Sequence, residues 1–369
     1  MADPVADEKT VDPAGRAAHA ERAVLDRSVR RLWGLPGTAL GVIGSPPSVG
    51  DRLFLGWNYW WQAHLVDCLV DAHQRDPQLW RIRLIDAVAR TVRLRNVLGW
   101  TNRYYDDMAW LGLALHRAAG VGAGPRTAVI DRLTTEMLDA WSDDEGGGIP
   151  WRRRDEFKNT PVNGPAAILL ARRGHLDRAG AMADWLDDRL RDPDSGLIWD
   201  GLRPGQIEKV IYTYCQGVVL GAEVELSVRT ARDRARVDRL VAAIAAGLSR
   251  DDVLTGHDGG DSGLFSGILA RYLGLVVTTD PGATDGSGRL SAAARTAARL
   301  VGASADAAWA NARPTPDGPL FGPRWDEPTR VPTGPRDRVP ERDLSVQLSG
   351  WMLLEADAAI RRVGVTVAG

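Results

Sequence analysis

The stretch GWTNRYYDDMAWLGLAL (residues 99–115) passes from an aromatic, polar loop into an amphipathic helix. Apolar side chains recur at helical spacing after Asp106 and Asp107, so we expect a helix that begins at this acidic pair. Similar stripes recur along the rest of the chain. They predict helices at roughly 15–34, 57–75, 78–97, 106–119, 125–142, 162–173, 175–191, 207–227, 229–249, 262–278, 288–312 and 342–363.

About twelve helices and no convincing strand run indicate an all-α fold. Short joins such as RDPQ (75–78) and RRGH (172–175) make consecutive helices antiparallel, and longer loops rich in Gly, Pro and Asp alternate with them. The longer loops would then gather at one end, where functional residues tend to lie. We predict an (α/α)6 barrel. A repeat solenoid is the alternative, although no fixed sequence period supports it.

The adjacent carboxylates of Asp106 and Asp107 are candidates for glycoside chemistry. Sugar transfer needs one carboxyl group that stays protonated and one that stays ionised. Neighbouring Cα atoms lie ~3.8 Å apart, and divergent side chains place the two carboxyl groups on the order of 5–6 Å apart. That separation favours a retaining mechanism. The alternative is structural, with Asp106 as an N-cap and Asp107 as a first-turn acid favoured by the helix dipole.

Composition limits the class of protein. The chain has 369 residues, of which 44% are hydrophobic and 25% charged, with a net charge of −2. This balance is typical of a globular protein and does not indicate the excess of positive charge by which proteins bind nucleic acid. No apolar run is long enough to span a membrane, and the start is acidic and polar, so we expect a cytoplasmic protein with no membrane partner. Cys68 and Cys215 are the two cysteines, so we expect neither a disulfide framework nor a zinc site.

We predict one domain over 1–369, with residues 1–14 as a flexible tail. Tryptophan is unusually frequent, with 14 Trp against 4 Phe and 6 Tyr. A flat apolar face with one donor suits the faces and hydroxyl groups of sugars, although it also suits burial. Helical stripes predict a core position for Trp33, Trp80, Trp185 and Trp351. Loop-to-helix junctions contain Trp57, Trp60, Trp61, Trp100, Trp151 and Trp199.

Six blocks of sequence carry a family resemblance. They are NYWWQAHLVDCLVDAHQR (58–75), YYDDMAWLGLAL (104–115), GGGIPWRRRDEFKNTPVNGPAAILLARR (146–173), GLIWDG (196–201), YTYCQGVVLGA (212–222) and GDSGLFSGILARYL (260–273). In type and order they resemble glycoside hydrolase family 76, the endo-α-1,6-mannanases. The resemblance implies an (α/α)6 barrel and retaining hydrolysis of α-1,6-linked mannan or manno-oligosaccharides. It assigns Asp106 as nucleophile and Asp107 as acid/base.

Candidate substrate-binding residues lie in these blocks. Aromatic and amide groups at helix entrances can stack on sugars or bond to their hydroxyls. The candidates are Trp61, Gln62, Tyr105, Trp151, Lys158, Asn159, Asn163, Tyr212, Tyr214 and Gln216. The chain departs from the family pattern at Pro150, where a second Trp is usual, and at Cys215, where Asn is expected. A Gly-rich turn with His257, Asp258 and Asp261 is interpreted as a cap for the next helix, with one of its residues at the rim of the cleft.

Two other functions remain open from the sequence. A sugar epimerase on the same barrel would use paired histidines, for which His64, His116, His175 and His257 are available. A non-catalytic carbohydrate-binding protein would keep the aromatic residues without needing both acids. For the hydrolase we expect a monomer, a mannan or manno-oligosaccharide as partner, no cofactor and no metal, since no dense ligand set with recognisable spacing is present.

Overall fold

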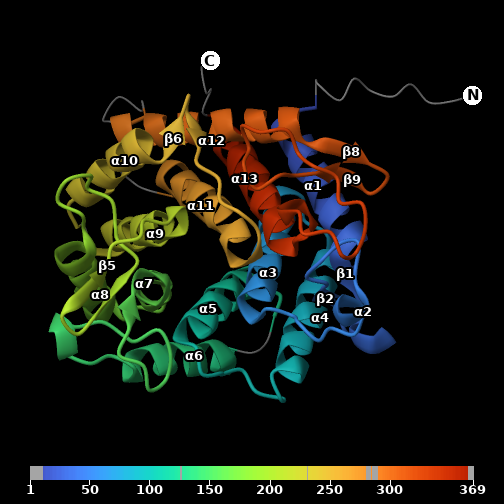
Figure 1. The fold of residues 1–369 in the computed structure, drawn as a ribbon. Coiled ribbons are helices and arrows are strands. Elements are labelled where there is room, and N and C mark those ends of the chain that lie inside the picture. The colour runs from blue at the N-terminus through green and yellow to red at the C-terminus, as the bar shows by residue number, and fades with distance from the viewer. Residues whose placement is uncertain (1–10, 125–126, 231, 280–283, 285–289, 365–369) are drawn as a thin grey trace, which may run out of the picture.

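Six helices form an inner ring, and six more pack around it (Figure 1). The computed structural model describes residues 11–124, 127–230, 232–279, 284 and 290–364. The inner helices are α3 (Tyr59–Arg75), α5 (Tyr105–Gly120), α7 (Thr160–Arg172), α9 (Thr213–Thr230), α11 (Phe265–Thr278) and α13 (Leu344–Arg362). The outer helices are α1 (Pro13–Ser28), α4 (Leu79–Arg95), α6 (Thr127–Asp139), α8 (Leu176–Leu190), α10 (Ala235–Gly247) and α12 (Ala292–Asn311).

The inner ring is closed. Each inner helix packs against the next one along the chain, and α13 returns to pack against α3. A solenoid would leave its first and last repeats apart. The prediction of an (α/α)6 barrel is therefore confirmed, and the solenoid alternative is excluded. The predicted helices all appear, with ends that shift by up to six residues, together with one short extra helix, α2 (Val49–Arg52).

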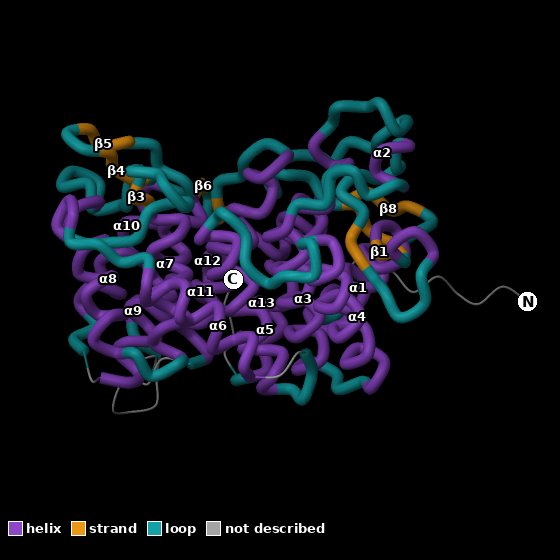
Figure 2. The backbone as a smooth tube through the Cα atoms, turned by 90° about the horizontal axis from the view of Figure 1, so that it is seen from below, coloured by secondary structure: helices purple, strands orange, loops and turns teal. Residues whose placement is uncertain are grey.

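Short strands, which the sequence did not predict, lie in the loops that lead into inner helices. They are β1 (Val29–Arg30), β2 (Leu40–Gly41), β3 (Lys158–Asn159), β4 (Gly201–Arg203), β5 (Gln206–Glu208), β6 (Ser249–Arg250), β7 (Val253–Leu254), β8 (Arg313–Thr315) and β9 (Gly318–Leu320). All pairings are antiparallel, and the three-stranded sheet has the order β3-β4-β5. The long loops and their strands lie toward one end of the barrel (Figure 2).

Two tryptophans predicted in the core lie at the surface instead. Trp33 is 57% exposed because α1 ends at Ser28, several residues earlier than the stripe suggested, and Trp33 falls in a turn with a φ of 48°. Trp80 is 45% exposed at the start of α4, where the guanidinium of Arg81 covers its ring at 4.7 Å. Trp185 and Trp351 are buried, as expected.

The predicted N-terminal tail lies mostly outside the described residues, which begin at residue 11. Asp12 caps α1 by accepting a hydrogen bond of 2.7 Å from the backbone N–H of Gly15, so residues 13 and 14 belong to the helix. Among the described helices, none has the length and apolarity needed to cross a lipid bilayer.

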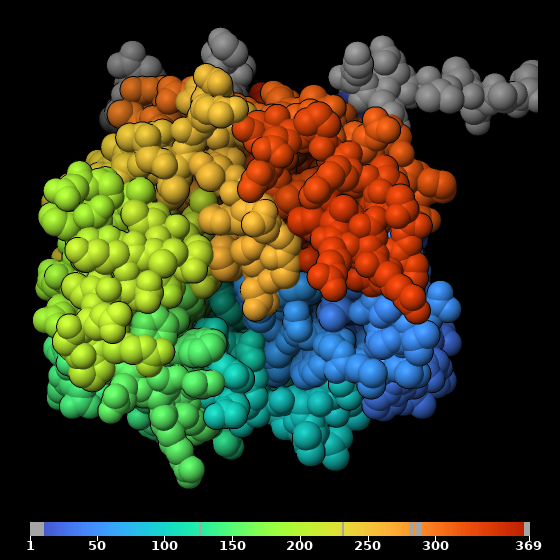
Figure 3. Space-filling view, in the orientation of Figure 1, coloured from blue at the N-terminus to red at the C-terminus, as the bar shows by residue number. Residues whose placement is uncertain are grey.

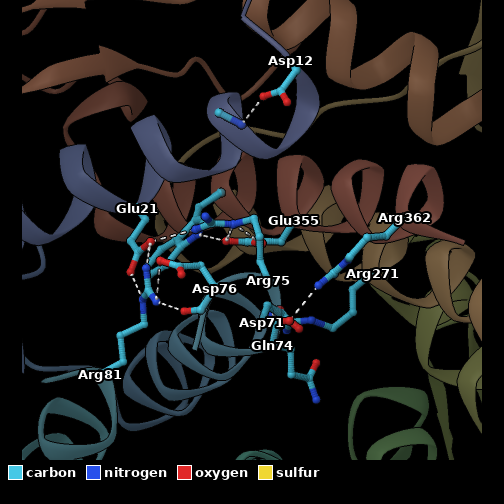
Figure 4. A network of polar contacts seen from close by, with 12 residues as sticks. Asp12, Glu21, Asp71, Gln74, Arg75, Asp76, Arg81, Arg271, Glu355 and Arg362 are labelled. Carbon is cyan, nitrogen blue, oxygen red and sulfur yellow. Dashed lines mark hydrogen bonds and ion pairs between the residues drawn. The ribbon is translucent and has the colours of Figure 1, made fainter. Parts of the chain in front are cut away.

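Buried ion pairs connect helices at the place where α13 packs against α3 and closes the inner ring (Figure 4). The Arg75 guanidinium on α3 pairs with Glu355 on α13 at 3.1 Å and with Glu21 on α1 at 2.8 Å. Arg81 on α4 also pairs with Glu21. Each of these side chains is almost fully buried, and removing one partner would leave an uncompensated charge. The network thus links two inner and two outer helices at the closure point.

Candidate active site

The acid pair lies in the first turn of α5. Because the long loops lead into the starts of the inner helices, this turn lies at the end of the barrel that carries those loops. Asp106 Oδ2 accepts a hydrogen bond from the indole Nε1 of Trp151 at 2.9 Å, and Asp106 Oδ1 accepts one from the backbone N–H of Asp107 at 2.9 Å. Both donors favour the ionised form of Asp106. The space-filling view along the barrel axis shows a hollow near the middle of the face (Figure 3).

Asp107 is held by a different donor. The side-chain amide of Asn102 donates to Asp107 Oδ2 at 2.6 Å, and Asn102 Oδ1 accepts from the backbone N–H of Tyr104. Asn102 therefore orients the second acid from the loop that precedes α5. Asn102 is not among the residues predicted from the sequence, although it stands five positions before Asp107 in the stretch that contains the pair.

A third carboxylate, Asp261, completes the acidic cluster. Its Oδ1 accepts hydrogen bonds from the indole Nε1 of Trp60 at 3.0 Å and of Trp61 at 2.9 Å. Asp261 lies in a 3-10 turn (Gly260–Leu264) immediately before α11, whereas the two tryptophans are in the first turn of α3. The Gly-rich turn interpreted as a helix cap thus places a carboxylate near the acid pair. Only the fold joins these segments, which are 200 residues apart.

The two acids have unequal electrostatic environments. Burial raises the pKa of Asp106 to about 6, while the Trp151 and Asp107 hydrogen bonds act in the opposite direction. Burial also raises the pKa of Asp107 well above its ordinary value, and the negative charges of Asp106 and Asp261 raise it further. Asp106 is therefore the member of the pair that ionises more readily, and Asp107 keeps its proton to higher pH.

Trp151 reaches the acid pair because residues 150–158 fold back on the start of α5. The backbone N–H of Tyr105 donates to the carbonyl of Trp151 at 2.9 Å, and isolated bridges join Tyr104 to Arg152 and Pro150 to Lys158. The preceding glycines serve packing. Gly148 has a φ of 84°, and a Cβ there would meet the Trp185 ring at 3.1 Å.

Aromatic residues from α9 and α11 form another wall. Tyr214 stacks on Phe265 with ring centroids 3.8 Å apart, and Tyr212 meets Phe265 edge-on at 5.3 Å. The charge of Asp106 contributes to raising the pKa of Tyr214, after the larger effect of burial, which places Tyr214 within electrostatic range of the acid pair. His257 packs on Phe265 and bonds to the Thr213 hydroxyl at 2.8 Å.

Three predicted substrate-binding amides lie beneath the site and bond to backbone. Gln62, Asn163 and Gln216 are completely buried. Each amide makes two hydrogen bonds to one residue of the loop that leads into its own helix. The amide oxygen accepts from that residue's N–H, and the amide nitrogen donates to its carbonyl. These loop residues are Gly41, Ile149 and Ile198, respectively. Each amide thus fixes a loop that shapes the site.

Gln347 on α13 repeats the arrangement with Phe321. In all four helices the amide is the fourth helical residue, and its nitrogen also donates to a carbonyl just before the helix. The described structure therefore contains a repeated contact that the sequence analysis missed. Its positions, 62, 163, 216 and 347, are unevenly spaced because the intervening loops differ in length.

Two further predicted substrate-binding residues, Lys158 and Asn159, have different surroundings. The Lys158 ammonium donates to three backbone carbonyls, those of Ser142, Asp144 and Gly147, so its charge holds the loop before Trp151. Asn159 is buried at the N-terminus of α7, and its Oδ1 has no hydrogen-bond partner among the described residues. Its acceptor is therefore unpaired and shielded from solvent in this structure.

Cys215 and Asp200 occupy the position where an Asn contact was expected. Cys215 is completely buried, and burial raises the pKa of its thiol well above the ordinary value, which opposes nucleophilic thiolate chemistry. Its Sγ lies 3.9 Å from Asp200 Oδ1. Burial, together with the nearby charge of Glu208, raises the pKa of Asp200 to about 6. The sequence analysis did not select Asp200, which follows Trp199 in the GLIWDG block.

The histidines do not form the pair that an epimerase would need. His64 is buried below Trp60 and beside Trp110, where burial lowers its pKa to about 3. Burial also lowers the pKa of His257 to about 4. His116 lies in the second half of α5, away from the first turn that carries the acid pair, and His175 lies between the end of α7 and the start of α8. Among the described residues, no group of three or more His, Cys, Asp or Glu is placed to hold a metal ion.

Comparisons with known proteins agree with this architecture. The family model described as glycosyl hydrolase family 76 matches residues 18–344. An inactive variant of the α-1,6-mannanase GH76A of Salegentibacter sp. HEL1_6, with two consecutive aspartates replaced by asparagine, was solved in complex with α-1,6-mannotriose. It is 30% identical, with a TM-score of 0.81 over 95% of this chain and 100% of that chain.

Two further solved structures extend the comparison. The Lin0763 protein from Listeria innocua is 25% identical, with a TM-score of 0.80 over 96% of this chain and 99% of that chain. A family 76 glycoside hydrolase from a bovine Bacteroides thetaiotaomicron strain is 15% identical and shares the fold, with a TM-score of 0.77 over 96% of this chain and 79% of that chain. A comparison with curated protein sequences gave no significant match. Because the family model matches most of the sequence, the chain belongs to glycosyl hydrolase family 76 and is a glycosidase.

Proposed function

We propose that this glycosidase cleaves α-1,6-linked mannan or manno-oligosaccharides with retention of configuration, using Asp106 as nucleophile and Asp107 as acid/base. The observation that carries the proposal is the unequal setting of the adjacent acids. Asp106 has two donors to its carboxylate, whereas the pKa of Asp107 is raised by burial and by two neighbouring negative charges. The solved α-1,6-mannanase that binds α-1,6-mannotriose supports the choice of substrate.

The reaction then proceeds in two steps. The Asp106 carboxylate attacks the anomeric carbon as its bond to the glycosidic oxygen breaks, and the Asp107 proton passes to the departing oxygen. In the second step, water gives a proton to Asp107 and attacks the anomeric carbon, which releases Asp106. Each step inverts the configuration, so the product keeps that of the substrate. The neighbouring charge of Asp106 disappears when it forms the ester, so the pKa of Asp107 falls and it becomes able to act as a base.

Trp151, Tyr105, Tyr212 and Tyr214 are proposed to line the sugar path, with Trp61 acting through Asp261. Asn159 is proposed to accept a hydrogen bond from a sugar hydroxyl, since its Oδ1 lacks a partner among the described residues. Gln62, Lys158, Asn163 and Gln216 are assigned instead to holding the loops, because their polar atoms already bond to backbone groups. A monomer in the cytoplasm remains the expectation from the sequence.

The test measures the release of reducing ends from α-1,6-mannan by the wild type, Asp106→Asn, Asp107→Asn and a control, Asp258→Asn. Asp258 is an exposed carboxylate on the Gly-rich turn before α11, with a side chain that is 83% exposed. We expect both acid-pair variants to lose at least ~10³-fold in rate while the control retains it. Proton NMR of the first product should show the α-anomer.

Added azide separates the two roles. It should restore turnover of Asp107→Ala on an activated substrate, because azide attacks the glycosyl-enzyme without needing a base. Activity of Asp106→Asn within a few-fold of wild type would overturn the assignment, and initial formation of the β-anomer would overturn retention.

A further inference from the structure

Exposed apolar side chains gather in the segment that connects α1 to α3. Of the 15 large hydrophobic residues that are exposed among the described residues, five lie within 33–55: Trp33, Leu35, Val49, Leu53 and Leu55. Val49 and Leu55 are 75% and 74% exposed. Single exposed apolar side chains are ordinary, whereas contiguous apolar patches mark contact surfaces. The hydrogen bond from the Trp33 indole to the Leu53 carbonyl brings the two ends of this segment together. We call residues 33–55 the α2 segment, after the short helix at its centre.

The same segment borders a pocket lined by arginines. The pocket, of about 480 Å³, has Arg27, Arg30, Arg31 and Arg52 among its lining residues, together with Trp33, and the lining includes no acidic residue. Burial lowers the pKa of Arg27, and the nearby charge of Asp317 acts in the opposite direction. Within the described part of the chain, none of the four arginines forms an ion pair. Arg27 and Arg30 donate to backbone carbonyls of the protein, so the charge open to an anion lies mainly on Arg31 and Arg52.

The backbone of the α2 segment is held in an unusual conformation. The exposed Trp33 and the buried Phe54 have φ values of 48° and 55°, a region that bulky residues rarely occupy. The Trp33 indole N–H donates to the Leu53 carbonyl at 2.9 Å, and the Arg95 guanidinium lies 5.5 Å from the Trp33 ring centre. Arg95 also donates to the Phe54 carbonyl at 2.9 Å. Unfavourable backbone conformations that several contacts maintain are concentrated at functional sites.

We propose that the α2 segment docks on the surface of an anionic phospholipid bilayer. The guanidinium groups would bind lipid phosphates, while Trp33 and the neighbouring aliphatic side chains enter the interface. Arginine beside exposed Trp and Leu suits the membrane–water interface, because arginine pairs with anionic headgroups and the apolar side chains leave water. Charge complementarity favours an anionic surface over a second copy of this chain, since the pocket would then meet its own positive charge.

Docking at this place would affect access to the active site. The α2 segment and the β3-β4-β5 sheet lie toward the same end of the barrel, which carries the long loops (Figure 2). The segment also runs directly into Trp57 and the first turn of α3, where Trp60 and Trp61 contact Asp261. The end of the barrel that holds the acid pair would therefore face glycans presented at the lipid surface. This inference goes beyond the glycosidase activity and replaces the expectation of no membrane partner.

Vesicle flotation tests the proposal without relying on catalysis. The full chain is mixed with phosphatidylcholine vesicles that contain or lack phosphatidylglycerol, at low and high salt. We expect binding only to the anionic vesicles, weakened by salt. The double substitution Arg31→Ser with Arg52→Ser should reduce the partition coefficient about 25-fold, since each arginine near an anionic surface contributes about fivefold. Leu55→Ser should reduce it about tenfold.

Matched variants provide the controls. Arg83→Ser with Arg239→Ser removes the same charge from exposed positions on α4 and α10, and Leu79→Ser alters a leucine that is 76% exposed at the start of α4. These variants should bind vesicles like wild type, and all variants should hydrolyse soluble α-1,6-mannotriose at the wild-type rate. Absence of binding to anionic vesicles at low salt would overturn the proposal. Equal loss in test and control variants, or a dimer in light scattering that Leu55→Ser abolishes, would also overturn it.

Discussion

Replacing Trp151 with phenylalanine should move the acidic limb of the pH–rate profile upward. The indole N–H donates to Asp106 at 2.9 Å and stabilises its ionised form, whereas the aromatic ring packs against Tyr104 with centroids 5.3 Å apart. Phenylalanine keeps most of the ring and removes the donor. A hydrogen bond to a charged group contributes about 1.5–3 kcal/mol. Since one pKa unit corresponds to about 1.4 kcal/mol, the loss equals about 1–2 units.

The pKa of Asp106 is raised to about 6 in the wild type, so Trp151→Phe should bring it to roughly 7–8. The assay is kcat/KM for α-1,6-mannotriose across pH, because its acidic limb reports ionisation of the nucleophile in the free enzyme. Trp141→Phe is the matched control, since the Trp141 indole also donates to an aspartate, Asp143, at 2.9 Å. An acidic limb that stays in place in Trp151→Phe would refute the role of this hydrogen bond, and so would an equal shift in the control.

Three further predictions follow from the same contacts. Folding raises the pKa of Asp106 by about two units. Ionisation of Asp106 therefore lowers the free energy of unfolding by up to about 3 kcal/mol above pH ~6, and this loss disappears below pH ~4. Asp106→Asn should therefore raise Tm by several degrees at neutral pH but not in acid; a lower neutral Tm would contradict this. Asp261→Asn should lower the pKa of Asp106 and Asp107, moving both limbs of the rate profile to lower pH, whereas Asp258→Asn should leave them in place. Gln62→Leu should destabilise the protein by about 2–5 kcal/mol in denaturant unfolding, because it leaves the N–H and carbonyl of Gly41 unpaired, with KM little changed. A large rise in KM at unchanged stability would instead place Gln62 in contact with substrate.

The amino-acid sequence was sufficient to predict the helices and their antiparallel order. A helix facing a core repeats its apolar residues every three to four positions, and this local pattern survives whatever the partner helix is. Trp33 and Trp80 show the limit of the pattern. It indicates that one side of a helix is apolar, but it does not reveal that α1 ends at Ser28 or that the start of α4 faces solvent.

The sequence also identified the acid pair, because Asp106 and Asp107 are neighbours in the chain and their spacing is fixed by covalent geometry. The difference between their pKa values was not accessible in this way. It depends on Trp151, Asn102 and Asp261, and Asp261 reaches the cluster only when α11 packs beside the other inner helices.

The role predicted from the sequence differs most from the observed role at the amide residues near the helix starts. Gln62, Asn163 and Gln216 have the hydrogen-bonding groups that sugars require, and the sequence cannot reveal whether those groups are already occupied. The fold brings each amide against the backbone of the loop that precedes its own helix. The sequence by itself determined which helices form and which acids are adjacent, because both are local properties. Tertiary structure decided which polar groups remain free to meet a ligand, because hydrogen bonding and burial depend on segments distant in the chain.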